Sequence, residues 1–437
     1  MEVPVPNFIK RTILAIRLIP IDQFSFYFSL IGYLAITFFI LILIVMAYIK
    51  IKFRFWSMQP VFHVYDFWYY LFPIGIIGYE LPTENKYCNF KNIECLPYSS
   101  VSKLQKATFF QFIRRNYLQN KENQYLPNES NIIPYFEGHN STCFFSFYYE
   151  DELLLDSKKS EFIPTKKCIG AMTTRPLHIT INLGKSTDRK KGTNKQELFD
   201  CYYVDYLCID AGHRKKGIAP QIIQTHHHHQ RRLNKNILVS LFKREGDLTG
   251  IVPLCVYDTY GYYLNGWSKP IALNAQIALV ECGPSNIHHL FDFMKIETRD
   301  KFDICISSEI SNLLELIKTK NIFVYMLIQD GDVLSCYFFR KTCTFVKKNV
   351  ECITLFASIL GNKIYKISSI FVQGYMNALW KICTGTSFQF AGIERVADNR
   401  IIIDGLLMKP HVISPTAYFF YNFAHPTFLS DRVFIVC

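Results

Sequence analysis

The sequence predicts an α/β (α+β) protein in which mixed β-sheets are flanked by helices and preceded by one transmembrane helix. Three observations lead to this prediction. Residues 201–225 have the pattern of a strand, a basic loop and a helix start, residues 24–49 carry no charge, and segments of strand and helix length follow one another in both halves of the chain. Half of the 437 residues are hydrophobic and 16% are aromatic, which excludes disorder as the default state.

The uncharged segment 24–49 is predicted to be a retained membrane anchor. A helix rises about 1.5 Å per residue, so this segment is longer than the roughly 30 Å hydrocarbon core of a bilayer. A cleaved signal peptide would have a shorter apolar region and a small-residue cleavage site, whereas this segment runs directly into the basic residues 50–54. Basic residues lie on both sides of the segment, so the positive-inside rule leaves its orientation open.

The segment 201–225 carries the clearest chemistry. Alternating β-branched and aromatic residues predict a strand that ends near Asp210. Three cations and Gly217 follow, and a helix-period apolar run then begins at Ile218. Amides at a helix N-terminus attract anions, a glycine lets a phosphate approach the backbone, and cations neutralise its charge. We therefore predict a loop that binds a pyrophosphate.

The net charge of +12 limits the classes of binding partner, and the 14 cysteines raise the question of disulfides and metal sites. The positive charge suits CoA phosphates, a membrane surface or nucleic acid and does not choose among them. We expect no nucleic-acid partner, because the basic run 185–195 is typical of a solvated hairpin tip. The cysteines are scattered and predicted to be reduced. No metal site is expected, since His226 and His229 share a helix face without an evident third ligand, and we interpret the histidines 226–229 as solvated.

Several motifs resemble one enzyme family. The pattern Arg214-x-x-Gly217-x-Ala219 after a strand resembles the acetyl-CoA loop of the GNAT acyltransferase superfamily. The residues YLCI at 206–209 and RKKGIAP at 214–220 are similar to the central motif of the N-myristoyltransferases. FWSMQPV at 55–61 resembles the segment that opens the catalytic region of that family, although an interfacial aromatic belt at the helix exit would explain it equally well.

The resemblance extends in consistent order from residue 55 to residue 437. It implies an N-terminal segment 1–23, the anchor 24–49, and two tandem GNAT-like domains: 50–265, which binds acyl-CoA, and 266–437. The second half contains a predicted hairpin that turns at Asp330-Gly331 but no second basic-glycine loop. The sequence departs from the family at several positions, among them the absent Gly-Asp-Gly before the last two strands, of which Asp404-Gly405 is the nearest remnant. The acidic cluster that follows Asn-Tyr is missing after Tyr117, and Gly261 stands where the family has a histidine.

The resemblance also assigns roles to residues. The backbone amides of Tyr206 and Leu207 would stabilise the oxyanion. Phe55 and Trp56 would cover the acyl donor. A carboxylate at Cys437, delivered by the apolar run 433–436, would take the proton of the attacking amine, although a core strand that simply ends there explains the same residues. The CoA phosphates would be held by Arg214, Lys215, Lys216, Gly217, Ile218 and Ala219.

The predicted function is that of a membrane-anchored N-acyltransferase, a glycylpeptide N-tetradecanoyltransferase. It would transfer myristoyl from myristoyl-CoA, its co-substrate, to the N-terminal glycine of a protein or peptide, without a prosthetic group. We expect a single-pass monomer whose catalytic domain faces the cytosol; the sequons at Asn128 and Asn140 matter only if this domain is lumenal. Two alternatives stay open: a catalytically degenerate acyl-CoA-binding or scaffold protein, and a GNAT acetyltransferase with a small acyl donor.

Overall fold

The computed structural model describes residues 21–72, 74–119, 123–156, 161–182, 196–246, 250–346, 350–362 and 368–437. The predicted hairpin tip 185–195 and most of the predicted N-terminal segment 1–23 lie outside these residues. The chain forms two compact units. The first comprises Met1–Gln59 and His63–Phe67, and the second comprises Pro60–Phe62 and Trp68–Cys437.

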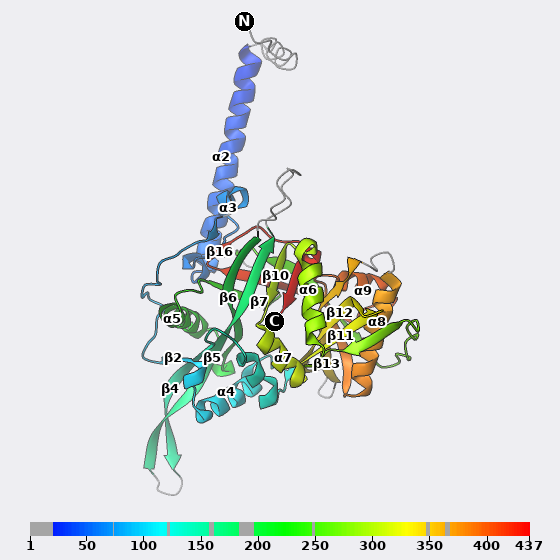
Figure 1. Cartoon of the computed structure of the whole chain (residues 1–437). Coiled ribbons are helices and arrows are strands. Elements are labelled where there is room, and N and C mark those ends of the chain that lie inside the picture. Colours follow the sequence, from blue (N-terminus) through cyan, green and yellow to red (C-terminus); the bar gives the residue numbers. More distant parts are fainter. Residues whose placement is uncertain are drawn as a thin grey trace. The chain divides into compact units, whose positions relative to one another are not determined.

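The first unit is dominated by helix α2 (Ile21–Lys52), drawn in blue in Figure 1. Apolar side chains are exposed along most of its length. Residues Ser25–Lys52 are long and apolar enough to cross a membrane by length and composition, and a signal sequence near the N-terminus would pass the same test. The predicted helix over residues 24–49 is therefore confirmed as a helix. A short 3-10 turn, η1 (Trp56–Met58), follows it.

A single sheet of 15 strands forms the centre of the second unit, so the two predicted halves share one sheet. Its main path is β17-β10-β5-β6-β7-β15-β8-β14-β13-β12-β11-β9, with β2, β3 and β4 beside it. The strands are β2 (Ile93–Pro97), β3 (Asn123–Tyr125), β4 (Phe144–Asp156), β5 (Glu161–Asn182), β6 (Gln196–Ile209), β7 (Val239–Glu245), β8 (Cys255–Tyr263), β9 (Ile277–Glu281), β10 (Ile304–Ser307), β11 (Ile322–Gln329), β12 (Asp332–Val346), β13 (Val350–Leu360), β14 (Phe388–Glu394), β15 (Val412–Tyr421) and β17 (Val433–Val436). Strands β1 (Gly75–Ile76) and β16 (Phe423–Ala424) pair separately.

Helices cover the sheet on both faces. Successive strand residues point to opposite faces. Ala171 of β5 packs in the cluster that contains Phe109 of α4, whereas the next residue, Met172, packs in the cluster that contains Ile222 of α5. These two helices therefore cover opposite faces of the first half. The helices are α3 (Phe67–Leu71), α4 (Lys103–Asn116), α5 (Ile218–Leu233), α6 (Ile287–Lys301), α7 (Ile310–Lys318), α8 (Ser368–Thr384) and α9 (Asn399–Gly405).

The same strand–helix–strand unit is present in each half. In the first half β6 leads through α5 to the parallel strand β7, and in the second half β13 leads through α8 to the parallel strand β14. Figure 1 shows α5 in green and α8 in orange. The predicted hairpin is also confirmed, because β11 and β12 pair across Asp330 and Gly331, which both have positive φ. The predicted fold class, a mixed sheet flanked by helices, is confirmed.

Candidate functional site

Strand β6 is irregular at the residues assigned to the oxyanion. On either side of this point β5 and β6 pair in register, but one residue of β5, Met172, lies opposite both Tyr206 and Leu207. The backbone of Tyr206 has a φ of 48°, which few residues other than glycine adopt. This is a β-bulge, which interrupts the ladder and re-aims the backbone of the bulged strand. The structure thus places Tyr206 and Leu207 where regular pairing between the two strands breaks.

An aromatic cluster holds the bulge in place. The Tyr206 ring makes edge contacts with Phe109 and Tyr117 at centroid distances of 5.8 and 5.5 Å. Its hydroxyl lies 3.1 Å from the hydroxyl of Tyr125, and the two form a hydrogen bond. Burial raises the pKa of Tyr206 well above its ordinary value, so the phenol stays neutral. Packing of this kind is what maintains an unfavourable backbone conformation.

Strands β6 and β7 part next to the bulge. Their parallel pairing covers only Cys201 to Tyr203 on β6, opposite Val239 to Leu241 on β7. Beyond these residues β7 continues along β15. The described residues show no further pairing between β6 and β7, so one edge of β6 from Val204 onward is without a neighbouring strand.

A groove of about 730 Å³ lies at the end of β6. The end of α4, the end of β6, the basic loop and the start of α5 form its walls. It contains Leu207 and most of the residues assigned to the CoA phosphates, but Lys216 is not part of the lining. The lining residues are Asn116, Tyr117, Leu118, Gln119, Leu207, Cys208, Ile209, His213, Arg214, Lys215, Gly217, Ile218, Ala219 and Pro220.

The loop leaves the N-terminus of α5 open. Gly217 caps the helix in the left-handed conformation, with a φ of 78° and without a side-chain hydrogen bond to the first turn. No acidic residue lies in that turn. A Cβ at Gly217 would meet no atom within 4 Å, so the space in front of the backbone is open. Uncapped N–H groups with a positive dipole end and nearby cations suit an anion such as a phosphate.

The cations of the loop differ in their surroundings. Arg214 donates from Nη2 to the carbonyl of Asn116 at 3.0 Å and from Nε to the carbonyl of Ile209 at 3.3 Å, so it ties the loop to the end of α4. Lys215 is exposed and lines the groove, and its backbone has a φ of 65°. Lys216 is exposed outside the lining. The structure therefore brings Arg214 and Lys215 to the groove, and of these Lys215 is the freer to move toward a ligand.

The prediction that the histidines on α5 are solvated was wrong: His226 and His228 are buried, and His227 and His229 are partly buried. The side chain of His226 is 1% exposed. Its ring nitrogens lie 2.8 Å from Ser146 Oγ and 2.9 Å from Thr174 Oγ1, on strands β4 and β5. Burial lowers the pKa of His226 to about 4 and that of His227 to about 3. These histidines are neutral packing residues between α5 and the sheet.

A buried cluster of charges lies around Cys437. Cys437 is 1% exposed and follows β17, which pairs with β10. Its carbonyl oxygen accepts a hydrogen bond from Arg340 Nη2 on β12 at 2.5 Å. Nearby, Arg175 on β5 is 2% exposed and donates from Nε to Asp205 Oδ2 at 2.7 Å. Interaction with Cys437 is among the causes that raise the pKa of both arginines, so the two pairs form one cluster.

Arg175, Asp205 and Arg340 were not predicted as site residues from the sequence. A usable signal was present for Asp205, which is the single charge in the apolar strand run 201–209, because charged side chains are seldom buried unless paired. The signal is weaker for Arg175, whose neighbours include two threonines, and for Arg340, which is followed by Lys341. The pairing itself could not be inferred, since Arg340 and Cys437 are 97 positions apart.

The two aromatic residues that were predicted to cover the acyl donor contact each other. Phe55 and Trp56 lie in the first unit, where their rings contact each other at a centroid distance of 5.1 Å. Neither residue is among those that line the groove.

At Gly261, a Cβ would lie 2.5 Å from the ring of Phe390. The aromatic ring occupies the space that a histidine side chain would need.

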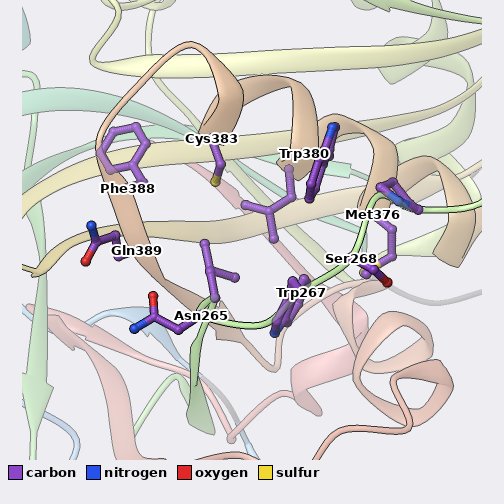
Figure 2. A pocket seen from close by; sticks show the side chains of 11 residues that line it. Asn265, Trp267, Ser268, Met376, Trp380, Cys383, Phe388 and Gln389 are labelled. Carbon is purple, nitrogen blue, oxygen red and sulfur yellow. The ribbon is translucent and has the colours of Figure 1, made fainter.

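The second half contains a smaller, apolar cavity of about 150 Å³. Figure 2 shows that its walls include Trp267 from the loop after β8 and Trp380 and Cys383 from α8. These residues of α8 belong to its C-terminal half, where the helix dipole is negative. The cavity thus differs from the groove at α5 and suits an apolar group rather than a phosphate.

No family model and no curated protein sequence matches the chain. Solved structures do match. Saccharomyces cerevisiae N-myristoyltransferase with bound myristoyl-CoA superposes with a TM-score of 0.65 at 15% identity, covering 87% of this chain and 90% of that chain. A second structure of that enzyme with bound myristoyl-CoA gives a TM-score of 0.61 at 14% identity over 86% of this chain and 94% of that chain. At this identity the likeness concerns the fold, and the chain therefore has the fold of an N-myristoyltransferase.

Proposed function

We propose that the protein is an acyl-CoA-dependent N-acyltransferase that transfers myristoyl from myristoyl-CoA to the N-terminal glycine of a protein. The observation that carries the proposal is the groove itself. Its lining includes Leu207 of the β-bulge as well as Lys215 and the first residues of the uncapped helix α5, whereas Tyr206 lies outside the lining. An acyl-CoA has the matching parts, a thioester at one end and phosphates at the other.

The donor would lie along the end of β6. Its pyrophosphate would accept hydrogen bonds from the amides at Gly217 and Ile218, with Lys215 and Arg214 balancing the charge. Its pantetheine amides would pair with the edge of β6 that β7 leaves free. The thioester carbonyl would then reach the bulge, where the amides of Tyr206 and Leu207 would stabilise the negative charge that develops during attack. The fold relatives supporting this donor carry bound myristoyl-CoA.

The acceptor amine would attack the thioester carbonyl directly. An ammonium has no lone pair, so it must first lose a proton to a base. The resemblance assigns this role to a carboxylate at Cys437. If that assignment is right, adding two residues after Cys437 should abolish transfer while CoA affinity stays unchanged. An extended protein that transfers at the native rate would exclude Cys437 as the base.

We further propose that α2 anchors the protein and that the second unit faces the cytosol, where acyl-CoA is available. Asn128 and Asn140 are exposed, so both sequons would be accessible to glycosylation in a lumenal domain. We expect no glycan at either site when the protein is expressed in eukaryotic cells. A mobility shift that a glycosidase removes would overturn this orientation.

The proposed function is tested with the full chain in detergent. The protein is incubated with a pool of glycine-initiated peptides and with CoA thioesters of graded chain length, and the peptides are analysed by mass spectrometry. We expect myristoylated peptides and little transfer from acetyl-CoA. Preferred acetyl transfer would support a small-acyl enzyme, and tight acyl-CoA binding without any product would support a degenerate binding protein.

A further inference from the structure

Asp205 presents a carboxylate oxygen beside the bulge. It precedes Tyr206 on β6, and its Oδ2 accepts the hydrogen bond from Arg175 Nε at 2.7 Å. Its other oxygen, Oδ1, has no hydrogen-bond partner in the part of the chain that the structure describes. The side chain is 19% exposed, whereas that of Arg175 is 2% exposed. One carboxylate oxygen of Asp205 is therefore hydrogen-bonded to a buried guanidinium, and the side chain remains partly exposed to solvent.

The carboxylate is held in a fixed position. The carbon of the Arg175 guanidinium lies 5.3 Å from the centre of the Tyr135 ring and 5.1 Å from that of Tyr203, so two aromatic rings hold the cation. Thr173 Oγ1 donates to the carbonyl of Asp205 at 3.2 Å, which secures the backbone directly before the bulge. A group held in this way can meet a substrate atom without first being ordered.

Asp205 offers a more accessible oxygen than Cys437. The oxygen of Cys437 already accepts a hydrogen bond from Arg340 and this residue is 1% exposed, whereas Oδ1 of Asp205 has no hydrogen-bond partner among the described residues and its side chain is 19% exposed. Burial raises the pKa of Asp205 above its ordinary value, although Arg175 and Arg340 act in the opposite direction. A base accepts protons most effectively when its pKa approaches the working pH.

The groups that act on Asp205 come from several elements. The titratable and charged side chains that interact electrostatically with it are Arg175, Arg340, Tyr117, Tyr135, Tyr203, Tyr206 and Cys143. The cations are the two arginines, while the phenols and the thiol are neutral near pH 7 because burial raises their pKa values. Among the described residues, the two arginines are therefore the charges that oppose protonation of Asp205, and Arg175 is already paired with it.

We propose that Asp205, rather than Cys437, binds the ammonium group of the acceptor and takes its proton before attack. The ammonium gives one proton to the Asp205 carboxylate, the neutral nitrogen forms a bond to the thioester carbonyl carbon, and the carbon–sulfur bond breaks. The second proton of the nitrogen leaves with the sulfur as CoA thiol, and Asp205 later releases its proton to water. This role rests on the proposed acyl transfer.

The test uses the full-length protein in detergent with Asp205→Asn, which keeps the shape of the side chain but cannot take a proton. We expect the rate of transfer at pH 7 to fall by about 10²- to 10⁴-fold, the usual contribution of a general base. The affinity for CoA should not change. The loss should shrink as the pH is raised to about 9, because an α-amine with a pKa near 8 then loses its proton without help.

The pH dependence separates catalysis from structure. A loss of equal size at pH 7 and at pH 9 would mean a structural role and would overturn the proposal, as would a variant that transfers at the wild-type rate. If Asp205→Asn alone does not fold, the double variant with Arg175→Gln removes both buried charges and should show the same recovery at high pH. If the wild-type protein transfers no acyl group under any condition, the proposed function fails and this role fails with it.

Discussion

Two adjacent lysines allow a sharp test of the phosphate loop. Lys215 and Lys216 are both exposed and carry the same charge, but only Lys215 lines the groove. A charge-assisted hydrogen bond contributes about 1.5 to 3 kcal/mol, and about 1.4 kcal/mol corresponds to a tenfold change in affinity. Because Lys215 is exposed, we use the lower end and expect Lys215→Ala to weaken CoA binding by about tenfold.

Lys216→Ala is the matched control. Without a place in the lining, Lys216 acts on the phosphates only through the solvent, where the Debye length is about 8 Å at physiological salt, so we expect a change of less than about twofold. Alanine keeps the Cβ at both positions, and the positive φ of Lys215 is therefore no more strained in the variant than in the native protein. Calorimetric titration of CoA into the three proteins measures the difference. Equal losses in the two variants, or a larger loss for Lys216→Ala, would refute the assignment of the phosphates to this groove.

Two further predictions concern stability. Burial lowers the pKa of His226 to about 4 and of His227 to about 3, so the unfolded chain binds protons that the folded chain excludes. The free energy of unfolding should be highest above about pH 7. It should fall by at most about 1.4 kcal/mol per pH unit for each histidine between about pH 6 and the folded-state pKa of about 4 for His226 or about 3 for His227. Denaturant midpoints that do not fall on acidification would contradict this. Gly138 and Gly246 both have positive φ, but a Cβ at Gly138 would lie 2.8 Å from the backbone of Ser311, whereas one at Gly246 would meet nothing within 4 Å. Chemical denaturation should therefore show that Gly138→Ala lowers the free energy of unfolding by about 1 to 3 kcal/mol more than Gly246→Ala does. Equal losses would mean that the backbone around Gly138 moves to accept the Cβ without a measurable cost.

Local signals in the sequence predicted local structure well. The strand, basic loop and helix at 201–225 follow from residue periodicity and from a glycine that the left-handed cap at Gly217 requires. The hairpin at Asp330 and Gly331 follows from turn chemistry. In both cases the decisive residues are neighbours in the chain, so no knowledge of distant pairing is needed.

The parts that were missed depend on distant pairing. The bulge at Tyr206 arises because one residue of β5 faces two of β6, and strand register of this kind cannot be read from either strand alone. His226 was misjudged for the same reason, since its partners Ser146 and Thr174 come from two strands far back in the chain. A polar run on a helix is normally solvated, and here hydroxyl groups on the sheet replace the solvent.

The charge cluster explains how the second half contributes to a site that lies mainly in the first. Arg340 belongs to β12 of the second half, yet it acts on both Cys437 and Asp205. Removing one partner of a buried ion pair leaves an uncompensated charge and costs about 3 to 5 kcal/mol. Arg175 and Arg340 therefore couple the bulge on β6 to the end of β17 through charges whose removal one at a time is destabilising. The sequence of the second half contains no loop of basic residues and glycine like the one at residues 214–217. The contribution of the second half to the proposed chemistry is the cation of Arg340.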